Sequence, residues 1–141
     1  MANEVTGTKA TGTYGIQGWD EKTWEGKDHK EQHGAKLTHA KIVQDYHGDF
    51  EGTAESQLVM SYLDDANATY LGLQKMTGEL AGRSGSFVMQ VIGGFAKGSA
   101  TSTFMIIPGS GTGELIGIHG SGETVAVHAD TQPYTLDYSF E

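Results

Sequence analysis

Residues 68–95 read ATYLGLQKMTGELAGRSGSFVMQVIGGF, which is two short apolar runs separated by a turn. Each run mixes β-branched and aromatic residues, and neither carries the 3.6-residue apolar period of an amphipathic helix. Between them, residues 82–85 are Gly-Arg-Ser-Gly, a typical turn sequence. The stretch therefore predicts a β-hairpin with strands at residues 68–79 and 85–95.

The same pattern extends over the rest of the chain. Glycine makes up 21 of the 141 residues, about twice its usual share of about 7%, and is spread out as turn residues are. Residues 19–34 are charged and interrupt the pattern, so they predict an excursion with one helical turn. We predict eight strands, at residues 10–18, 35–47, 53–63, 68–79, 85–95, 100–107, 115–120 (to 128 in one alternative) and 133–140.

An internal repeat indicates how these strands are connected. The segment TGELAG at residues 77–82 recurs as TGELIG at residues 112–117, as if one corner were used twice in an up-and-down meander. Eight short antiparallel strands with no helix to cover an edge are best stabilised by closing the sheet. We therefore predict an all-β protein, a closed antiparallel up-and-down β-barrel of about eight strands formed by a single domain, residues 1–141. Such a barrel holds packed side chains or one small ligand.

Charge and composition exclude several classes of partner. Nine Lys and Arg residues stand against eighteen Asp and Glu, and Arg83 is the single arginine, so we expect neither a nucleic-acid nor a membrane partner. The absence of cysteine excludes disulfides, thiolate nucleophiles and Cys-ligated zinc. No signal-peptide pattern and no run of about 18 apolar residues are visible, which predicts a cytoplasmic protein.

Five segments resemble a bacterial family of unknown function whose structures are similar to the allene oxide cyclase barrel. They are YLGL (70–73), TG (77–78), GRSGSFVMQ (82–90), PGSGTGEL (108–115) and YTLDY (134–138). The resemblance runs from about Gly48 to the C-terminus and implies a barrel without implying an activity. The chain departs from the family's frequent Glu at Gln57 and Gln74, Arg at Lys75 and His at Val91, which favours binding over acid–base catalysis.

Hairpin geometry predicts which side chains face the barrel interior, because paired antiparallel strands alternate sides together. If Gln57, Gln74 and Gln90 form one row, the opposite face is the more apolar one and should line the lumen. A slip of one residue would invert this assignment. The predicted lumen residues are Leu58, Met60, Tyr62, Leu71, Leu73, Lys75, Phe87, Met89 and Val91, extended by Ile42, Met105 and Ile107.

Two polar groups on that face are the predicted catalytic residues. Lys75 could anchor a carboxylate or enolate, or act as a base or Schiff-base amine, unless it reaches out of the rim. Tyr62 could orient a carbonyl oxygen, unless it is simply a buried tyrosine with a satisfied hydroxyl. The predicted ligand-binding residues are Gln44, Tyr46, Leu58, Met60, Leu71, Leu73, Phe87 and Met89.

Other motifs carry no predicted chemistry. His29 and His33 have the i, i+4 spacing of zinc ligands but lack a third ligand, so a solvated loop is favoured and no metal is expected. The glycine-rich run at residues 109–113 has no following Lys and is interpreted as a barrel corner, which leaves no predicted cofactor.

The outer surface and the lumen leave three functions open. Residues 87–89 and 104–107 are apolar on both faces, so we expect a homo-oligomer, or a lid from residues 19–34, to cover them. The lumen predicts an isomerase or cyclase acting on a small apolar molecule that bears a carbonyl or carboxylate. The alternatives are a non-enzymatic carrier of such a molecule, and a filled barrel that serves only in assembly.

Overall fold

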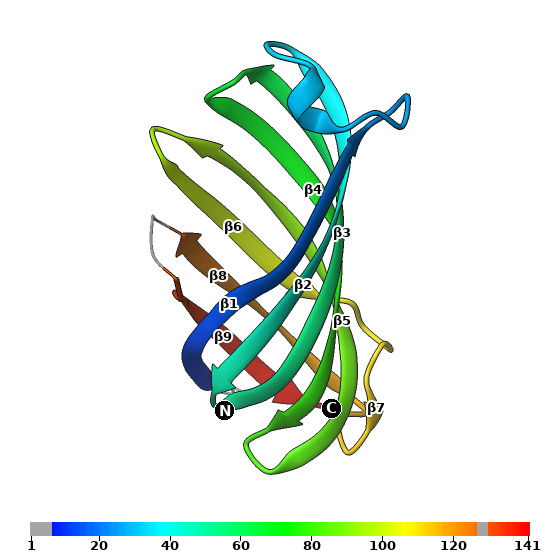
Figure 1. The fold of residues 1–141 in the computed structure, drawn as a ribbon. Helices are drawn as coiled ribbons and strands as arrows, with labels where there is room; N and C mark the ends of the chain where they lie inside the picture. Colours follow the sequence, from blue (N-terminus) through cyan, green and yellow to red (C-terminus); the bar gives the residue numbers. More distant parts are fainter. Residues whose placement is uncertain (1–6, 127–129) are drawn as a thin grey trace.

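The computed structural model describes residues 7–126 and 130–141, and most of them lie in strands (Figure 1). One short 3-10 turn, η1 (His29–Glu31), follows the first strand. Residues 7–126 and 130–141 contain no helix long and apolar enough to cross a membrane. The strands are β1 (Thr8–Thr23), β2 (Lys36–Gly48), β3 (Phe50–Asp64), β4 (Asn67–Leu80), β5 (Arg83–Ala96), β6 (Ser99–Ile106), β7 (Thr112–Gly113), β8 (Ile118–Ala126) and β9 (Gln132–Phe140).

The sheet closes on itself. From β1 to β6 each strand pairs antiparallel with the next, β6 pairs with β8, β8 with β9, and β9 returns to β1. The two-residue β7 is an addition to the edge of β5. Because the sheet is closed, each of the eight long strands has a hydrogen-bonded neighbour on both sides. The predicted closed, eight-stranded antiparallel barrel is confirmed.

All eight long strands differ from their predicted bounds by at least one residue, and the differences in β1 and β8 change how residues were assigned. β1 continues through residues 19–23, where we expected an excursion, and a bulge between Ile16 and Gly18 changes which positions face inward. After the bulge the side chains of Trp19, Glu21 and Thr23 lie on the inner side of the barrel. This charged stretch therefore alternates as a strand does, but its inward side chains include polar ones. β8 starts at Ile118 instead of 115, because residues 112–117 form β7 and a turn. The alternative strand end at His128 lies outside the described residues.

One end of the barrel is packed solid. Six side chains with almost no exposed surface fill it and form what we call the apolar plug: Phe50, Leu80, Phe87, Ile106, Leu115 and Ile118. The Phe50 ring meets the Phe87 ring edge to face, with 5.9 Å between centroids. The residues at this end come from the starts of β3 and β5 and from the ends of β4 and β6 (Figure 1). The plug closes one end, so any ligand must enter the lumen from the other.

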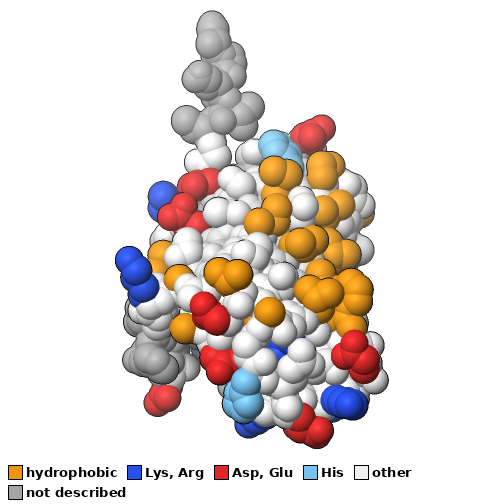
Figure 2. All heavy atoms as spheres, turned by 90° about the horizontal axis from the view of Figure 1, so that it is seen from above, with side chains coloured by type: hydrophobic (Ala, Val, Ile, Leu, Met, Phe, Trp, Pro, Cys, Tyr) orange, Lys and Arg blue, Asp and Glu red, His pale blue; other side chains and the backbone are white. Residues whose placement is uncertain are grey.

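The outside of β2–β5 carries apolar side chains, which we call the outer wall. Val43, Val59, Leu71 and Leu73 are all more than 40% exposed there. In the view from above, hydrophobic side chains gather along the side of the molecule on which β2, β3 and β5 lie in Figure 1 (Figure 2). A barrel in water normally alternates apolar inside with polar outside, so this wall departs from that pattern.

Candidate functional site

The observed strand register turns β4 over relative to our prediction. Gln74 pairs with Ser56 and Met89, not with Gln57 and Gln90. Two local features cause the shift. A bulge at Leu63 adds one residue to β3 next to the β3–β4 turn. The β4–β5 turn consists of Ala81 and Gly82, both at positive φ as in a type I′ hairpin, and it shifts the β4–β5 pairing by one position from our prediction.

Four predicted lumen residues therefore lie outside. Lys75 is exposed on the outer wall, and Leu71 and Leu73 beside it are 51% and 54% exposed. Met105 is exposed as well, because β6 pairs with β5 through Met89 and Ile106 and turns Phe104 and Ile106 inward. The lumen placement of Lys75, Leu71, Leu73 and Met105 was wrong.

The predicted lumen residues on β2, β3 and β5 face the barrel interior. Gln44, Tyr46, Leu58, Met60 and Tyr62 line a cavity of about 440 Å³ in the open half of the barrel. Phe87 and Met89 also point inward, but they do not line this cavity: Phe87 belongs to the apolar plug and Met89 lies next to it. The cavity wall is rich in aromatic rings, namely Tyr14, Trp19, Tyr46, Tyr62, Tyr70, Phe95 and Phe104.

Deep in the cavity, four polar side chains form a hydrogen-bonded chain that we call the polar floor: Gln44, Ser56, Gln74 and Tyr46. The Ser56 hydroxyl lies 2.9 Å from Oε1 of Gln44 and 2.9 Å from Oε1 of Gln74. Nε2 of Gln74 donates to the Tyr46 hydroxyl at 2.7 Å. All four side chains are buried, so each hydrogen bond here is shielded from bulk water.

A carboxylate lies at the open end of the cavity. Glu21 is 4% exposed, and its Oε2 accepts hydrogen bonds from Thr38 Oγ1 at 2.6 Å and the Tyr62 hydroxyl at 2.7 Å. Its Oε1 accepts from Trp19 Nε1 at 3.0 Å, and His29 Nδ1 lies 3.5 Å away. We call Glu21, Trp19, Thr38, Tyr62 and His29 the mouth cluster.

The mouth cluster keeps the charge on Glu21 and the proton on Tyr62. Burial raises the pKa of Glu21, but the hydrogen bonds from Thr38, Tyr62 and Trp19, with nearby His29, lower it more, so that it lies below its usual value. Burial and then the adjacent Glu21 carboxylate raise the pKa of Tyr62 well above its usual value. Tyr62 is therefore a hydrogen-bond donor that does not ionise near neutral pH.

The η1 turn is fastened beside this end of the barrel. Lys36 Nζ donates to the carbonyl oxygens of His29 and Gln32 at 2.7 and 2.8 Å and lies 4.7 Å from the centre of the Tyr62 ring. His33 Nδ1 lies 3.4 Å from Asp65 on the β3–β4 turn. The two histidines thus contact different carboxylates, and no cluster of three metal-binding side chains forms among residues 7–126 and 130–141.

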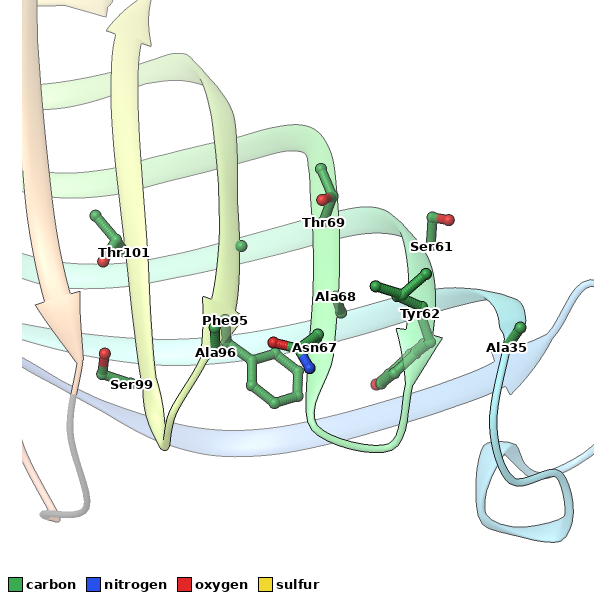
Figure 3. Close-up of a pocket in the computed structure, with 12 residues that line it drawn as sticks. Ala35, Ser61, Tyr62, Asn67, Ala68, Thr69, Phe95, Ala96, Ser99 and Thr101 are labelled. Atoms are coloured by element: carbon green, nitrogen blue, oxygen red, sulfur yellow. The ribbon is translucent and has the colours of Figure 1, made fainter.

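A second hollow of about 620 Å³ lies by the β3–β4 and β5–β6 turns (Figure 3). Tyr62 and Phe95 line both this hollow and the lumen cavity. Their rings meet edge to face, with 6.2 Å between centroids. They form an aromatic wall between the lumen and the turns at the rim.

Sequence reasoning missed the residues that organise the site. Glu21 and His29 were assigned to a solvated excursion, and Gln74 was placed on the outer face. The alternation Trp19-x-Glu21-x-Thr23 was the available signal for a strand here, but the bulge at residue 17 separates it from the inward positions before it.

Comparisons with known proteins define a family and a fold. A family model described as "Protein of unknown function (DUF3224)" matches residues 10–138. The crystal structure of a protein with unknown function from this family, from Shewanella oneidensis MR-1, superimposes with a TM-score of 0.77 at 23% identity, over 96% of this chain and 98% of that chain. The comparison with curated proteins gave no match. Similarity to the allene oxide cyclase barrel stays a prediction.

Proposed function

The chain belongs to the DUF3224 family, whose description assigns no activity, and from the geometry of the lumen we propose that the protein binds a small, mostly apolar molecule inside its barrel. The observation that carries this proposal is the cavity of about 440 Å³. Ligand pockets usually occupy about 300–1,000 Å³ and combine apolar walls with a few polar groups. The aromatic walls, the polar floor and the mouth cluster fit that description.

The two halves of the barrel support different parts of our sequence interpretation. The apolar plug is what a filled barrel requires, and by itself it would favour an assembly module. The open half instead keeps a cavity, which buried apolar and aromatic side chains such as Leu58, Tyr70 and Phe104 line without filling it. Packed interiors contain few voids larger than a water molecule, so a retained cavity of this size favours a ligand.

Filling the cavity should abolish binding. The neutral fluorescent probe N-phenyl-1-naphthylamine reports on apolar cavities, and we expect it to bind the wild-type protein. In Ala100→Phe the affinity for the probe should fall at least tenfold, which corresponds to about 1.4 kcal/mol of binding free energy. Ala100 lines the cavity near its open end. Thr103→Phe adds the same ring on the outside of the same strand and should leave the affinity unchanged. Equal affinities in both variants would show that the probe binds elsewhere.

Lys75 serves as a second control in the same titration. Lys75→Met should bind the probe as the wild type does, because the side chain lies on the outer wall. A large loss in this variant would mean that the probe binds in the hollow of about 800 Å³ that Lys75 lines on the outer wall, and not in the lumen.

An isomerase or cyclase acting in the same lumen is the second candidate, and the mouth cluster is the observation that favours it. A carboxylate, an imidazole and a protonated phenol lie together beside an apolar cavity, and such groups can move or hold a proton on a bound molecule. Incubation with an extract of its own cell distinguishes the two. A carrier returns its ligand unchanged, whereas an isomerase converts it into a species of the same mass and different chromatographic retention.

We also propose that the outer wall mediates self-association. Burying apolar side chains such as Leu73 and Val59 from two copies would remove them from water. Leu73→Glu should lower the sedimentation mass toward that of one chain. Leu63→Glu, at an exposed leucine in the bulge near the end of β3, should leave the mass unchanged. A monomeric wild-type protein would refute the proposal.

A further inference from the structure

We propose that the cavity selects an apolar molecule whose head group is uncharged and both donates and accepts a hydrogen bond, as an alcohol does. This inference rests on the proposed ligand-binding function and names the chemical class of the ligand.

The hydrogens of the polar floor can be counted. Nε2 of Gln74 donates to Tyr46, which turns Oε1 of Gln74 toward Ser56. The Ser56 hydroxyl has one hydrogen, yet it lies 2.9 Å from the oxygens of both glutamines. If Ser56 donates this hydrogen to Oε1 of Gln74, its hydroxyl oxygen has only a lone pair to offer Gln44. The two orientations of an amide have the same shape, and turning Gln44 by half a turn places its Nε2 against Ser56 as a donor.

In this arrangement every hydrogen bond of the polar floor is donated in the same direction, from Gln44 to Ser56, from Ser56 to Gln74 and from Gln74 to Tyr46. At its start the Gln44 amide faces Ser56 with Nε2, so that its Oε1 points away from Ser56 as an acceptor, and the contact with Ser56 is the one hydrogen bond seen for this amide among the described residues. At its end Tyr46 accepts from Gln74 and keeps its own hydrogen to donate. Burial raises the pKa of Tyr46 well above its usual value, so the phenol stays protonated. The floor therefore offers an acceptor and a donor.

Both ends of the chain belong to the same cavity. Gln44 and Tyr46 are two residues apart on β2 and point to the same side, which places their Cα atoms about 7 Å apart. A ligand hydroxyl can give its hydrogen to Gln44 and accept one from Tyr46. A group that only accepts, such as an ether, leaves Gln44 unmatched, and an unmatched buried polar group is unfavourable.

The charges around the cavity disfavour ionised head groups. No Lys or Arg is among the described residues that line it: Lys75 is on the outer wall, and Lys36 Nζ is bonded to carbonyl oxygens of the η1 segment. A carboxylate would lose its hydration without meeting a Lys or Arg, and at the mouth it would reach His29 only beside the Glu21 carboxylate, which repels it. An ammonium would find the Glu21 oxygens already occupied by Thr38, Tyr62 and Trp19.

The test is a competition against bound N-phenyl-1-naphthylamine at neutral pH. The competitors share a ten-carbon chain and differ in the head group: 1-decanol, 1-methoxydecane, decanoate and decylamine. We expect 1-decanol to displace the probe at a concentration at least about tenfold lower than decanoate and decylamine, and several-fold lower than 1-methoxydecane. The ether is the important comparison, because any apolar cavity prefers an uncharged chain to a charged one.

Two variants separate recognition by the floor from simple partitioning. In Gln44→Leu the preference for 1-decanol over 1-methoxydecane should fall to within about twofold, and Ser56→Ala should reduce it as well. Gln57→Leu, on the outside of β3, should keep the wild-type preference. Circular dichroism shows whether each variant retains its sheet, and Ser56→Ala provides the test if Gln44→Leu does not fold.

The outcomes distinguish this inference from the proposed function. Failure of the probe to bind the wild-type lumen overturns both. Binding of the probe without preference for 1-decanol, or a preference that survives in both Gln44→Leu and Ser56→Ala, overturns the head-group inference and leaves the ligand-binding proposal standing. Strongest displacement by decylamine also overturns it, and assigns recognition to the Glu21 carboxylate at the mouth.

Discussion

Phe87→Ala will lower the free energy of unfolding by about 3–5 kcal/mol, the usual loss when a fully buried phenylalanine is truncated. Phe87 has no exposed surface, and its ring lies at the centre of the apolar plug against Phe50. The neighbouring side chains belong to closed strands that cannot collapse into the space left behind. The loss in unfolding free energy should therefore include the cost of the cavity as well as that of the lost burial of the ring.

Urea unfolding followed by tryptophan fluorescence measures this loss. Val88→Ala is the matched control, because Val88 is the next residue on β5 and points to the outer, half-exposed side. It should change the free energy of unfolding by less than about 1 kcal/mol. Similar losses in both variants would contradict the assignment of faces on β5. Probe binding should survive in Phe87→Ala if the variant is folded, since the ring does not line the cavity.

The strands and their closure were predictable because they rest on many residues at once. Turn sequences recur at regular intervals, each stretch between them has strand composition, and eight strands without a helix leave closure as the way to pair their edges. Each predicted strand corresponds to one long strand of the barrel. A misplaced boundary, as in β8, does not change this result.

The faces of the strands were less predictable because each depends on single residues. The bulge at Leu63 and the turn at Ala81 each shift the pairing by one position, and one position exchanges the two faces of a strand. The assignment therefore held for Leu58, Met60 and Phe87 but failed for β4. Lys75 became the leading catalytic candidate through this slip, while Gln74 was placed outside.

The mouth cluster was hidden for a related reason. Glu21 belongs to a charged stretch, and charged stretches usually lie in solvent. Only the bulge in β1 and the pairing of β1 with β2 and of β2 with β3 bring Glu21 beside Thr38 and Tyr62. The hydroxyls that donate to Glu21 are 17 and 41 residues away in the sequence, so no local sequence pattern indicates these hydrogen bonds.

Glu21→Leu should destabilise the protein by about 3–5 kcal/mol, the range for removing one partner of a buried charged network. Leucine leaves the Thr38 and Tyr62 hydroxyls without their acceptor. Glu21→Gln should cost less, about 1–2 kcal/mol, because an amide oxygen can still accept from both hydroxyls while the amide nitrogen faces the Trp19 donor. Glu55→Leu, on the exposed side of β3, should stay within about 0.5 kcal/mol of the wild type.

The pH dependence of the same comparison tests whether Glu21 is ionised. Its pKa in the folded protein lies below the value of about 4.3 expected for an unfolded chain, so ionisation stabilises the fold. The stability difference between wild type and Glu21→Gln should therefore be complete above about pH 4.3 and shrink as the pH falls through the lower folded-state pKa. A difference that grows on acidification would mean that Glu21 is protonated in the folded barrel. The mouth would then carry no carboxylate charge to repel an anionic ligand.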